Sequence, residues 1–108
     1  MKLRYKVWFE KDGKPLLSSG KYELLKQIEK TGSIKRAAAS LGIPYKKAHL
    51  YVKLLEERFG KPLFHRERGK GTTLTPEGRK LLETYERVLK AFDELAGRLE
   101  KLLPPDRD

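Results

Sequence analysis

The side chains of this sequence that are best suited to chemistry are cations, and they gather in two short stretches. The stretches are Tyr45, Lys46, Lys47, His49 and Lys53, and then Arg66, Arg68 and Lys70. Lysine and arginine neutralise phosphate groups, and side chains in the first turns of a helix contact base edges when that helix lies in the major groove of DNA. The chemistry that these residues offer is recognition of an anionic partner.

The two histidines, His49 and His65, do not form a catalytic or metal-binding pattern. Neither has a carboxylate at ligand spacing, and the chain has no cysteine. The lack of cysteine excludes disulfides and thiolate zinc sites together. The sequence therefore predicts no enzyme, no metal site and no cofactor.

Positive charge is concentrated in the middle of the chain. The formal net charge is +10, and residues 33–71 carry 10 basic and 3 acidic side chains, whereas residues 72–108 carry 7 and 8. Such a balance favours nucleic acid, an acidic protein or a membrane surface as partner. Apolar runs are only a few residues long, so neither a membrane span nor a signal peptide is predicted, and we expect a cytoplasmic protein.

Length and composition bound the fold. With 108 residues and 38% hydrophobic content, the chain has the size of one domain with a modest core. It contains no asparagine, one glutamine and 37% charged residues. This usage is typical of proteins that work at high temperature, so a thermophilic source is expected.

Three helices are predicted to position the first basic stretch. Helical spacing and glycine stops place them at residues 21–31, 34–41 and 45–59, with a tight glycine-containing turn between the second and third. Ser33 is predicted to cap the second helix, and the buried face of the third is predicted to consist of Ala48, Val52, Leu55 and Phe59. The small Ala37 and Ala38 let the second helix approach the third closely. An ordinary helical hairpin in another kind of bundle is the alternative. The cations crowded at the start of 45–59 favour a helix-turn-helix.

The second basic stretch is predicted to be a wing, spanning residues 62–75. Two short strands, 63–67 and 72–74, flank a tip with Gly69 and Gly71, whose conformational freedom suits a hairpin. Its cations can reach backbone phosphates or a minor groove. The same charges could instead keep an edge hairpin soluble. The position directly after the helix pair favours contact with phosphate.

The N-terminal residues are predicted to form another hairpin. Apolar and polar residues alternate over 3–10, which is typical of a strand, and residues 11–14 form an Asp-Gly turn before a short second strand at 15–17. Trp8 falls on the polar side of the first strand. It is expected to pack on another element or a partner subunit, and stacking on a nucleobase is the alternative.

A long helix is predicted from 76 to 103, capped by Thr75, with a tail at 104–108. Its apolar residues follow a heptad pattern, and at about 1.5 Å per residue the helix is some 40 Å long, too long for this domain to cover. The alternative is that the stripe covers only the domain's own core. We expect a homodimer through the exposed part of the stripe, namely Val88, Phe92, Leu95, Leu99 and Leu102.

The stretch from Leu24 to Gly78 resembles the N-terminal domain of LysR-type and especially ModE-type transcriptional regulators. The resemblance is carried by Gly32-Ser33-Ile34, Ala37-Ala38, Leu41-Gly42-Ile43, Tyr45-Lys46, Leu55-Glu56, Leu63-Phe64, Arg66, Leu74-Thr75 and Gly78. The N-terminal Tyr5-Lys6-Val7-Trp8 and Asp12-Gly13-Lys14 resemble small stand-alone members of the ModE-like group.

This resemblance implies a winged helix that dimerises through its terminal helix on a two-fold related DNA site. It implies that the helix from Tyr45 reads bases and that Ser33 and Lys35 contact phosphate. His49 stands where ModE-like sequences tend to have tryptophan, and the wing is shorter and less rich in glycine. The resemblance therefore implies the docking mode and leaves the operator sequence open. Because the sequence stops at Asp108, no effector domain is expected, and molybdate binding is not expected either.

The sequence thus predicts a mainly α fold with a small amount of β, a winged helix-turn-helix with an N-terminal hairpin (1–75) and a dimerisation helix (76–103). The predicted function is sequence-specific transcriptional regulation by a homodimer on double-stranded DNA. A sequence-neutral architectural protein and a protein-interaction winged helix are the two alternatives.

Overall fold

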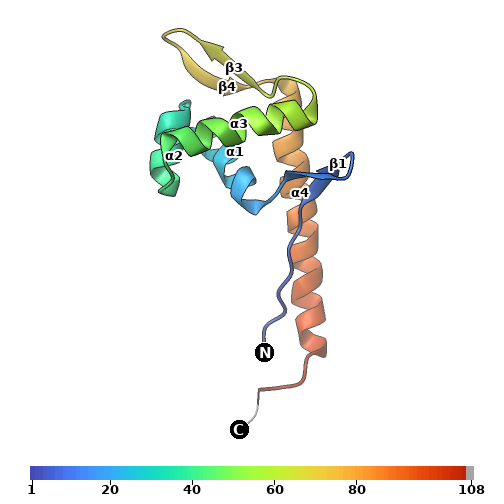
Figure 1. Cartoon of the computed structure of the whole chain (residues 1–108). Coiled ribbons are helices and arrows are strands. Elements are labelled where there is room, and N and C mark those ends of the chain that lie inside the picture. Colours follow the sequence, from blue (N-terminus) through green and yellow to red (C-terminus); the bar gives the residue numbers. More distant parts are fainter. Residues whose placement is uncertain (107–108) are drawn as a thin grey trace.

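The computed structural model describes residues 1–106 and consists of a small helical head from which one long helix extends (Figure 1). The last two residues of the predicted tail lie outside the described residues. The elements are β1 (Phe9–Lys11), β2 (Lys14–Leu17), α1 (Ser19–Thr31), α2 (Ile34–Leu41), α3 (Tyr45–Phe59), β3 (Phe64–Glu67), β4 (Gly71–Leu74), α4 (Pro76–Leu99) and the 3-10 turn η1 (Glu100–Leu102). This order confirms the predicted winged helix-turn-helix. Among residues 1–106, no helix is long and apolar enough to cross a membrane.

The core lies between the three helices of the head. Ile28, Ala37 and Ala48 are fully buried, and Val52 is 1% exposed. The alanines let α2 and α3 approach closely, because a larger side chain at either position would hold the helices apart. The predicted inner face of α3 is confirmed, apart from Phe59, which is only half-buried.

Caps fix where α2 and α4 begin. The Ser33 hydroxyl accepts a hydrogen bond from the Arg36 N–H at 3.1 Å, and the Thr75 hydroxyl accepts one from the Gly78 N–H at 3.0 Å. Each bond satisfies an N–H that lacks a partner within the helix. Both predicted caps are confirmed, and α3 has the predicted bounds.

The wing, β3 and β4, is fastened to the turn between α1 and α2. The Thr72 N–H donates to the Gly32 carbonyl at 2.8 Å. A Cβ on Gly71 would lie 2.4 Å from that same carbonyl oxygen, and Gly71 has φ +80°. Only glycine allows both this backbone conformation and this close approach. The base of the wing is therefore placed by contact with the head.

The predicted N-terminal strand over residues 3–10 is wrong for most of its length. Only Phe9–Lys11 pairs with β2, and Met1–Trp8 forms an arm without a strand partner. The reason is that β2 ends at Leu17, directly before the cap of α1, so no strand remains for residues 1–8 to pair with.

The arm lies on α4 instead (Figure 1). Tyr5 stacks on Phe92 with ring centroids 6.1 Å apart, and the Tyr85 hydroxyl donates to the Val7 carbonyl at 2.8 Å. The N-terminal amine of Met1 contacts the Asp106 carboxylate. The alternation along residues 3–10 therefore reflects packing on a helix.

The end of α4 also differs from the prediction. The α-helix stops at Leu99, and η1 follows, whereas the sequence predicted α-helix to Leu103. Proline disfavours helical geometry in the residue before it, and Leu103, which precedes Pro104, is extended at φ −73° and ψ 147°. The influence of Pro104 thus reaches back through the last turn.

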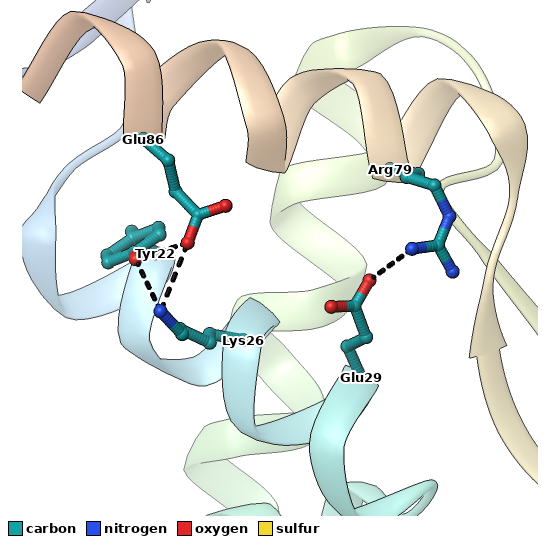
Figure 2. Close-up of polar contacts among 5 residues, drawn as sticks. All are labelled: Tyr22, Lys26, Glu29, Arg79 and Glu86. Carbon is teal, nitrogen blue, oxygen red and sulfur yellow. Dashed lines mark hydrogen bonds and ion pairs between the residues drawn. The ribbon is translucent and has the colours of Figure 1, made fainter. Parts of the chain in front are cut away.

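Polar contacts hold the first half of α4 to α1 (Figure 2). Glu86 accepts hydrogen bonds from the Tyr22 hydroxyl at 2.8 Å and from the Lys26 ammonium at 3.1 Å, and Arg79 pairs with Glu29 at 2.9 Å. The pKa of the Glu86 carboxyl lies below its ordinary value. Partial burial, the largest single influence, raises this pKa, but the hydrogen bonds from Tyr22 and Lys26 and the lysine charge together outweigh it.

Replacing Glu86 with glutamine is expected to lower stability at neutral pH, and the difference from wild type should vanish on acidification. A carboxyl whose pKa is lowered by folding stabilises the folded state at pH values above its ordinary pKa of 4.5. This stabilisation is lost as the pH falls through the lower pKa of the folded state. The side chains of the Lys26–Glu86 ion pair are both partly exposed to water, so we expect a loss of at most about 1 kcal/mol. Urea unfolding at neutral and acidic pH measures the difference. Glu83→Gln, at an exposed position of α4, is the control.

Candidate nucleic-acid interface

The outward face of α3 presents two lysines and a leucine to solvent. Lys46, Leu50 and Lys53 follow one another at i, i+4 and i+7, so they share one face of the helix, and all three are exposed. Glu57 continues this stripe one turn further on. Because Ala48 and Val52 fill the inner face, the helix is fastened along one side and free along the other.

The flanks of α3 carry the other predicted residues of this stretch. On one flank, the rings of Tyr45 and His49 lie 5.9 Å apart, and Tyr45 is 50% exposed whereas His49 is half-buried. On the other flank, the Lys47 ammonium lies 5.8 Å from the centre of the Tyr51 ring. The structure therefore separates residues that the sequence groups in one basic stretch, and Lys47 lies on a flank of the helix.

Lys21 belongs to this second flank, and sequence reasoning missed it. Its ammonium also lies 5.8 Å from the Tyr51 ring, so Lys21 of α1 and Lys47 of α3 gather at one aromatic side chain. Such cation–π contacts are electrostatic and depend on proximity in space. No sequence signal links positions so far apart.

The start of α2 offers a second place for an anion. Ser33, Lys35 and Arg36 stand in its first turn, which contains no acidic residue. A helix N-terminus carries partial positive charge, and the Ser33 hydroxyl retains its own proton as a donor while it caps the helix. Lys35 was predicted, whereas the exposed Arg36 was not.

The wing carries three exposed cations, two of which have acidic partners. Arg66 lies 3.9 Å from Glu56, and Lys70 lies 3.5 Å from Glu67. Within residues 1–106, Arg68 makes no ion pair, so its charge is the least compensated of the three. All three predicted wing residues are thus at the surface, on a hairpin beside α3 (Figure 1).

Glu56 of α3 fixes the root of the wing, and sequence reasoning missed this role. Its carboxylate accepts hydrogen bonds from the Leu63 N–H at 2.8 Å and the Phe64 N–H at 3.3 Å, besides facing Arg66. A carboxylate that accepts two backbone N–H bonds fixes the direction in which the strand leaves the helix. The motif Leu55-Glu56 therefore has a structural reason.

Replacing Glu56 with alanine is expected to loosen the wing. Two backbone donors lose a charged acceptor, and hydrogen bonds to charged groups contribute about 1.5–3 kcal/mol each. We expect a loss near the lower end of this range, because the Glu56 side chain is itself 26% exposed, so its removal opens a path for water to the two donors. Amide exchange should accelerate at Leu63 and Phe64 while the amides of α1 keep their protection. Glu57→Ala, at the next and exposed position, should leave these rates unchanged.

The predicted DNA-binding residues thus occupy the outward face of α3, its flanks, the start of α2 and the wing. Figure 1 shows the wing alongside α3 and the far half of α4 extending away from both. A helix about 10–12 Å wide, fastened on one side only and bearing lysines on the other, has the width that the major groove of DNA admits.

Comparison with known proteins connects this geometry to a family. Residues 20–79 match the family described as "Bacterial regulatory helix-turn-helix protein, lysR family". The "Uncharacterized HTH-type transcriptional regulator YcgK" of Bacillus subtilis is 33% identical over 79 residues, which are 73% of this chain and 24% of that protein. The "Probable RuBisCO transcriptional regulator" of Gracilaria tenuistipitata var. liui is 40% identical over 77 residues, 71% of this chain and 25% of that protein.

The fold is also found in solved structures. One is the DNA-binding domain of BenM in its complex with benA site 1 DNA, which matches with a TM-score of 0.68 and 20% identity. The match covers 81% of the present chain and the whole of the BenM domain. At this identity the likeness concerns the fold. The present chain spans about a quarter of the length of the curated relatives that it matches.

Proposed function

This chain belongs to the lysR family of bacterial regulatory helix-turn-helix proteins, and we propose that it is a sequence-specific DNA-binding transcriptional regulator that acts as a homodimer. The observation that carries the proposal is α3, which is packed through Ala48 and Val52 and leaves Lys46, Leu50 and Lys53 free. A fastened helix with a free polar face is what major-groove recognition requires.

The proposed docking assigns a role to each predicted residue. Lys46, Lys53 and the ring pair Tyr45–His49 face the groove. Lys47, Lys35 and the Ser33 hydroxyl bind phosphates beside it, and the wing, through Arg66, Arg68 and Lys70, contacts the flanking backbone. Support comes from the exposure of the cations and from the fold shared with the DNA complex of the BenM domain.

We propose that α4 pairs with α4 of a second copy in antiparallel orientation. The 24 residues of α4 span about 36 Å at 1.5 Å per residue, and the far half of the helix extends away from the head, where it is open to a second copy (Figure 1). The stripe is also nearly symmetric about Leu95, since Val88 and Leu102 each lie seven residues from it.

The proposal is tested by measuring binding of the whole chain to duplexes selected from genomic DNA and to random duplexes, over a range of salt. We expect affinity to fall steeply with salt because counterions are released, and a preference of about 10³ or more for selected DNA. The selected fragments should show two-fold symmetry. Absence of DNA binding at low salt would contradict the proposal.

One observation favours the architectural alternative. The outward stripe of α3 contains lysine and leucine but no arginine, whose planar guanidinium suits paired contacts to guanine. It also contains no asparagine or glutamine, which make paired contacts to adenine. Equal affinity for selected and random DNA in the same experiment would assign the protein to sequence-neutral binding.

Three finer proposals rest on composition and on the N-terminal residues. We infer membership of the ModE-like group, supported by the arm and hairpin that precede the matched stretch at residue 20. We infer a cytoplasmic location, as expected of a DNA-binding protein. We also infer a thermophilic source, which an unfolding midpoint above the range of about 45–65 °C of mesophilic domains would support.

A further inference from the structure

The head of this protein exposes large apolar side chains only on the helix that is proposed to enter DNA. Nine such side chains are exposed within residues 1–106, and seven of them stand on the N-terminal arm or on the far half of α4 and η1. The other two, Tyr45 and Leu50, stand on α3, and each is 50% exposed. Tyr45 has a hydroxyl group and a ring partner in His49, whereas Leu50 is wholly apolar. Leu50 is therefore the exposed residue of α3 that binding of phosphate does not explain.

The fold does not require a leucine at position 50. The side chains of α3 that face the core are Ala48, Val52 and Leu55. Leu50 lies on the opposite side of the helix, in solvent. Alanine favours a helix at least as well as leucine does, so the stability of α3 does not depend on leucine either. Leu50 is therefore free to contact a partner.

Leucine can stabilise a complex with DNA in one way only. Its side chain has no hydrogen-bond donor or acceptor, so it binds neither phosphates nor the polar edges of bases. It contributes by removing apolar surface from water. In the major groove, the apolar group that the bases present is the C5 methyl of thymine, whereas guanine and adenine present donors and acceptors there. A leucine that faces this groove therefore favours thymine.

We propose that Leu50 packs on the methyl group of a thymine at a fixed position in each half-site. This contact makes Leu50 a specificity-determining residue, because it sets one base of the sequence that the protein prefers. The inference rests on the function proposed above, namely sequence-specific binding of a homodimer through α3. Its ligand is the methyl group that projects from thymine into the major groove.

The place of Leu50 along α3 supports contact with bases. It stands in the second turn, and the first turns of a recognition helix are the part that meets base edges. At 1.5 Å per residue, it lies about 6 Å beyond Lys46 and about 4.5 Å before Lys53. Neither lysine forms an ion pair within residues 1–106, so both are available to hold this face against the groove. Their methylene stems exclude water on either side of the leucine.

The chemistry of the outward stripe matches the edge of thymine. Thymine presents the O4 acceptor beside its methyl group, and the two lysines next to Leu50 supply donors. Cytosine and adenine present amino groups that need an acceptor, and none of Lys46, Leu50 and Lys53 supplies one. An amino group buried against this stripe would lose its hydrogen bond to water, which is costly. The stripe therefore favours thymine through both its donors and its apolar side chain.

The test exchanges the thymines of a selected duplex for deoxyuridine, one position at a time, and measures the affinity of the whole chain by anisotropy at fixed salt. Deoxyuridine lacks only the methyl group, so the base keeps its hydrogen bonds and the protein is unchanged. We expect one thymine in each half-site whose exchange weakens binding about fourfold, the effect of one methyl group that is no longer buried. Exchange in both half-sites together should weaken binding about 15-fold.

Three variants assign the methyl contact to a side chain. Leu50→Ala should bind the selected duplex about tenfold more weakly and should no longer distinguish thymine from deoxyuridine. Position 50 is exposed, so this variant should fold as the wild type does, which circular dichroism checks. Leu50→Met keeps an apolar side chain of similar volume and should retain the discrimination. Tyr45→Ala, which removes the other exposed apolar side chain of α3, should also retain the discrimination at that thymine.

The outcomes separate this inference from the function on which it rests. A selected site in which no thymine can be exchanged with loss of affinity would overturn the inference, and so would a loss that persists in Leu50→Ala. In either case, a preference for selected over random DNA would leave the proposed function standing. Equal affinity of the wild-type chain for selected and random DNA would overturn the sequence-specific function and this inference together.

Discussion

Replacing Gly78 with alanine is expected to lower the stability of this protein strongly. A Cβ at this position would lie 2.2 Å from the Leu63 carbonyl oxygen and 3.1 Å from the Leu63 carbonyl carbon. Both are backbone atoms, so no rotation of a side chain relieves the contact. Overpacking of this kind costs about 1–3 kcal/mol and occasionally more.

The surroundings of Gly78 place the expected loss at about 3 kcal/mol, the upper end of that range. The Thr75 N–H donates to the same Leu63 carbonyl at 3.0 Å, and the Thr75 hydroxyl donates to the Pro62 carbonyl at 2.9 Å. The first turn of α4 cannot lift away from the root of the wing without breaking these bonds. Urea unfolding followed by circular dichroism measures the loss.

Gly97→Ala is the matched control, since it adds the same methyl group to the same helix. A Cβ at Gly97 meets no atom within 4 Å. Alanine is favoured over glycine inside a helix by about 1 kcal/mol, so Gly97→Ala should be neutral or slightly stabilising. Equal stability of the two variants would show that the contact between Gly78 and Leu63 is not tight.

Replacing Lys46 with glutamate is expected to weaken DNA binding by about 100-fold or more. Lys46 is exposed in the first turn of α3, where side chains meet base edges or the adjacent phosphates. The exchange removes one favourable contact and brings a carboxylate toward a phosphate. Loss of a base contact costs about 1–3 kcal/mol, and like charges brought together at an interface cost several more.

Two further variants make this result specific. Lys90→Glu reverses a charge on the exposed face of α4, away from α3, and should change affinity only slightly. Lys46→Ala separates the two possible contacts of Lys46. An equal loss on selected and random duplexes assigns the lysine to phosphate, and a larger loss on selected DNA assigns it to base reading. Anisotropy titrations at fixed salt measure all three, and an unchanged affinity of Lys46→Glu would exclude α3 from the interface.

The head could be predicted from the sequence because its signals are local. Glycines at helix ends, capping hydroxyls and the spacing of apolar residues act within one or two turns, and they placed α3 at Tyr45–Phe59 and the caps at Ser33 and Thr75. The end of α4 was misplaced for a related reason. The effect of Pro104 extends backward through η1, further than a stop signal at the proline itself indicates.

The arm shows why a period of two does not by itself make a strand. Residues 3–10 alternate because one side packs against α4, and a strand also needs a partner with free backbone groups, which β2 is too short to supply. Which partner is present depends on the whole fold. The pattern specified which side of the arm is buried, and the tertiary structure decided what covers it.

The basic side chains also show which properties the sequence determines and which ones the tertiary structure determines. Their identity, their number and their crowding between residues 33 and 71 are properties of the sequence, and they point to an anionic partner wherever the chain folds so as to expose them. Tertiary structure alone decided that Lys47 turns to the flank beside Lys21, and that Glu56 holds the root of the wing. The physical reason is range: helix spacing and caps act between neighbours along the chain, whereas these contacts join residues that only the packing of the helices brings together.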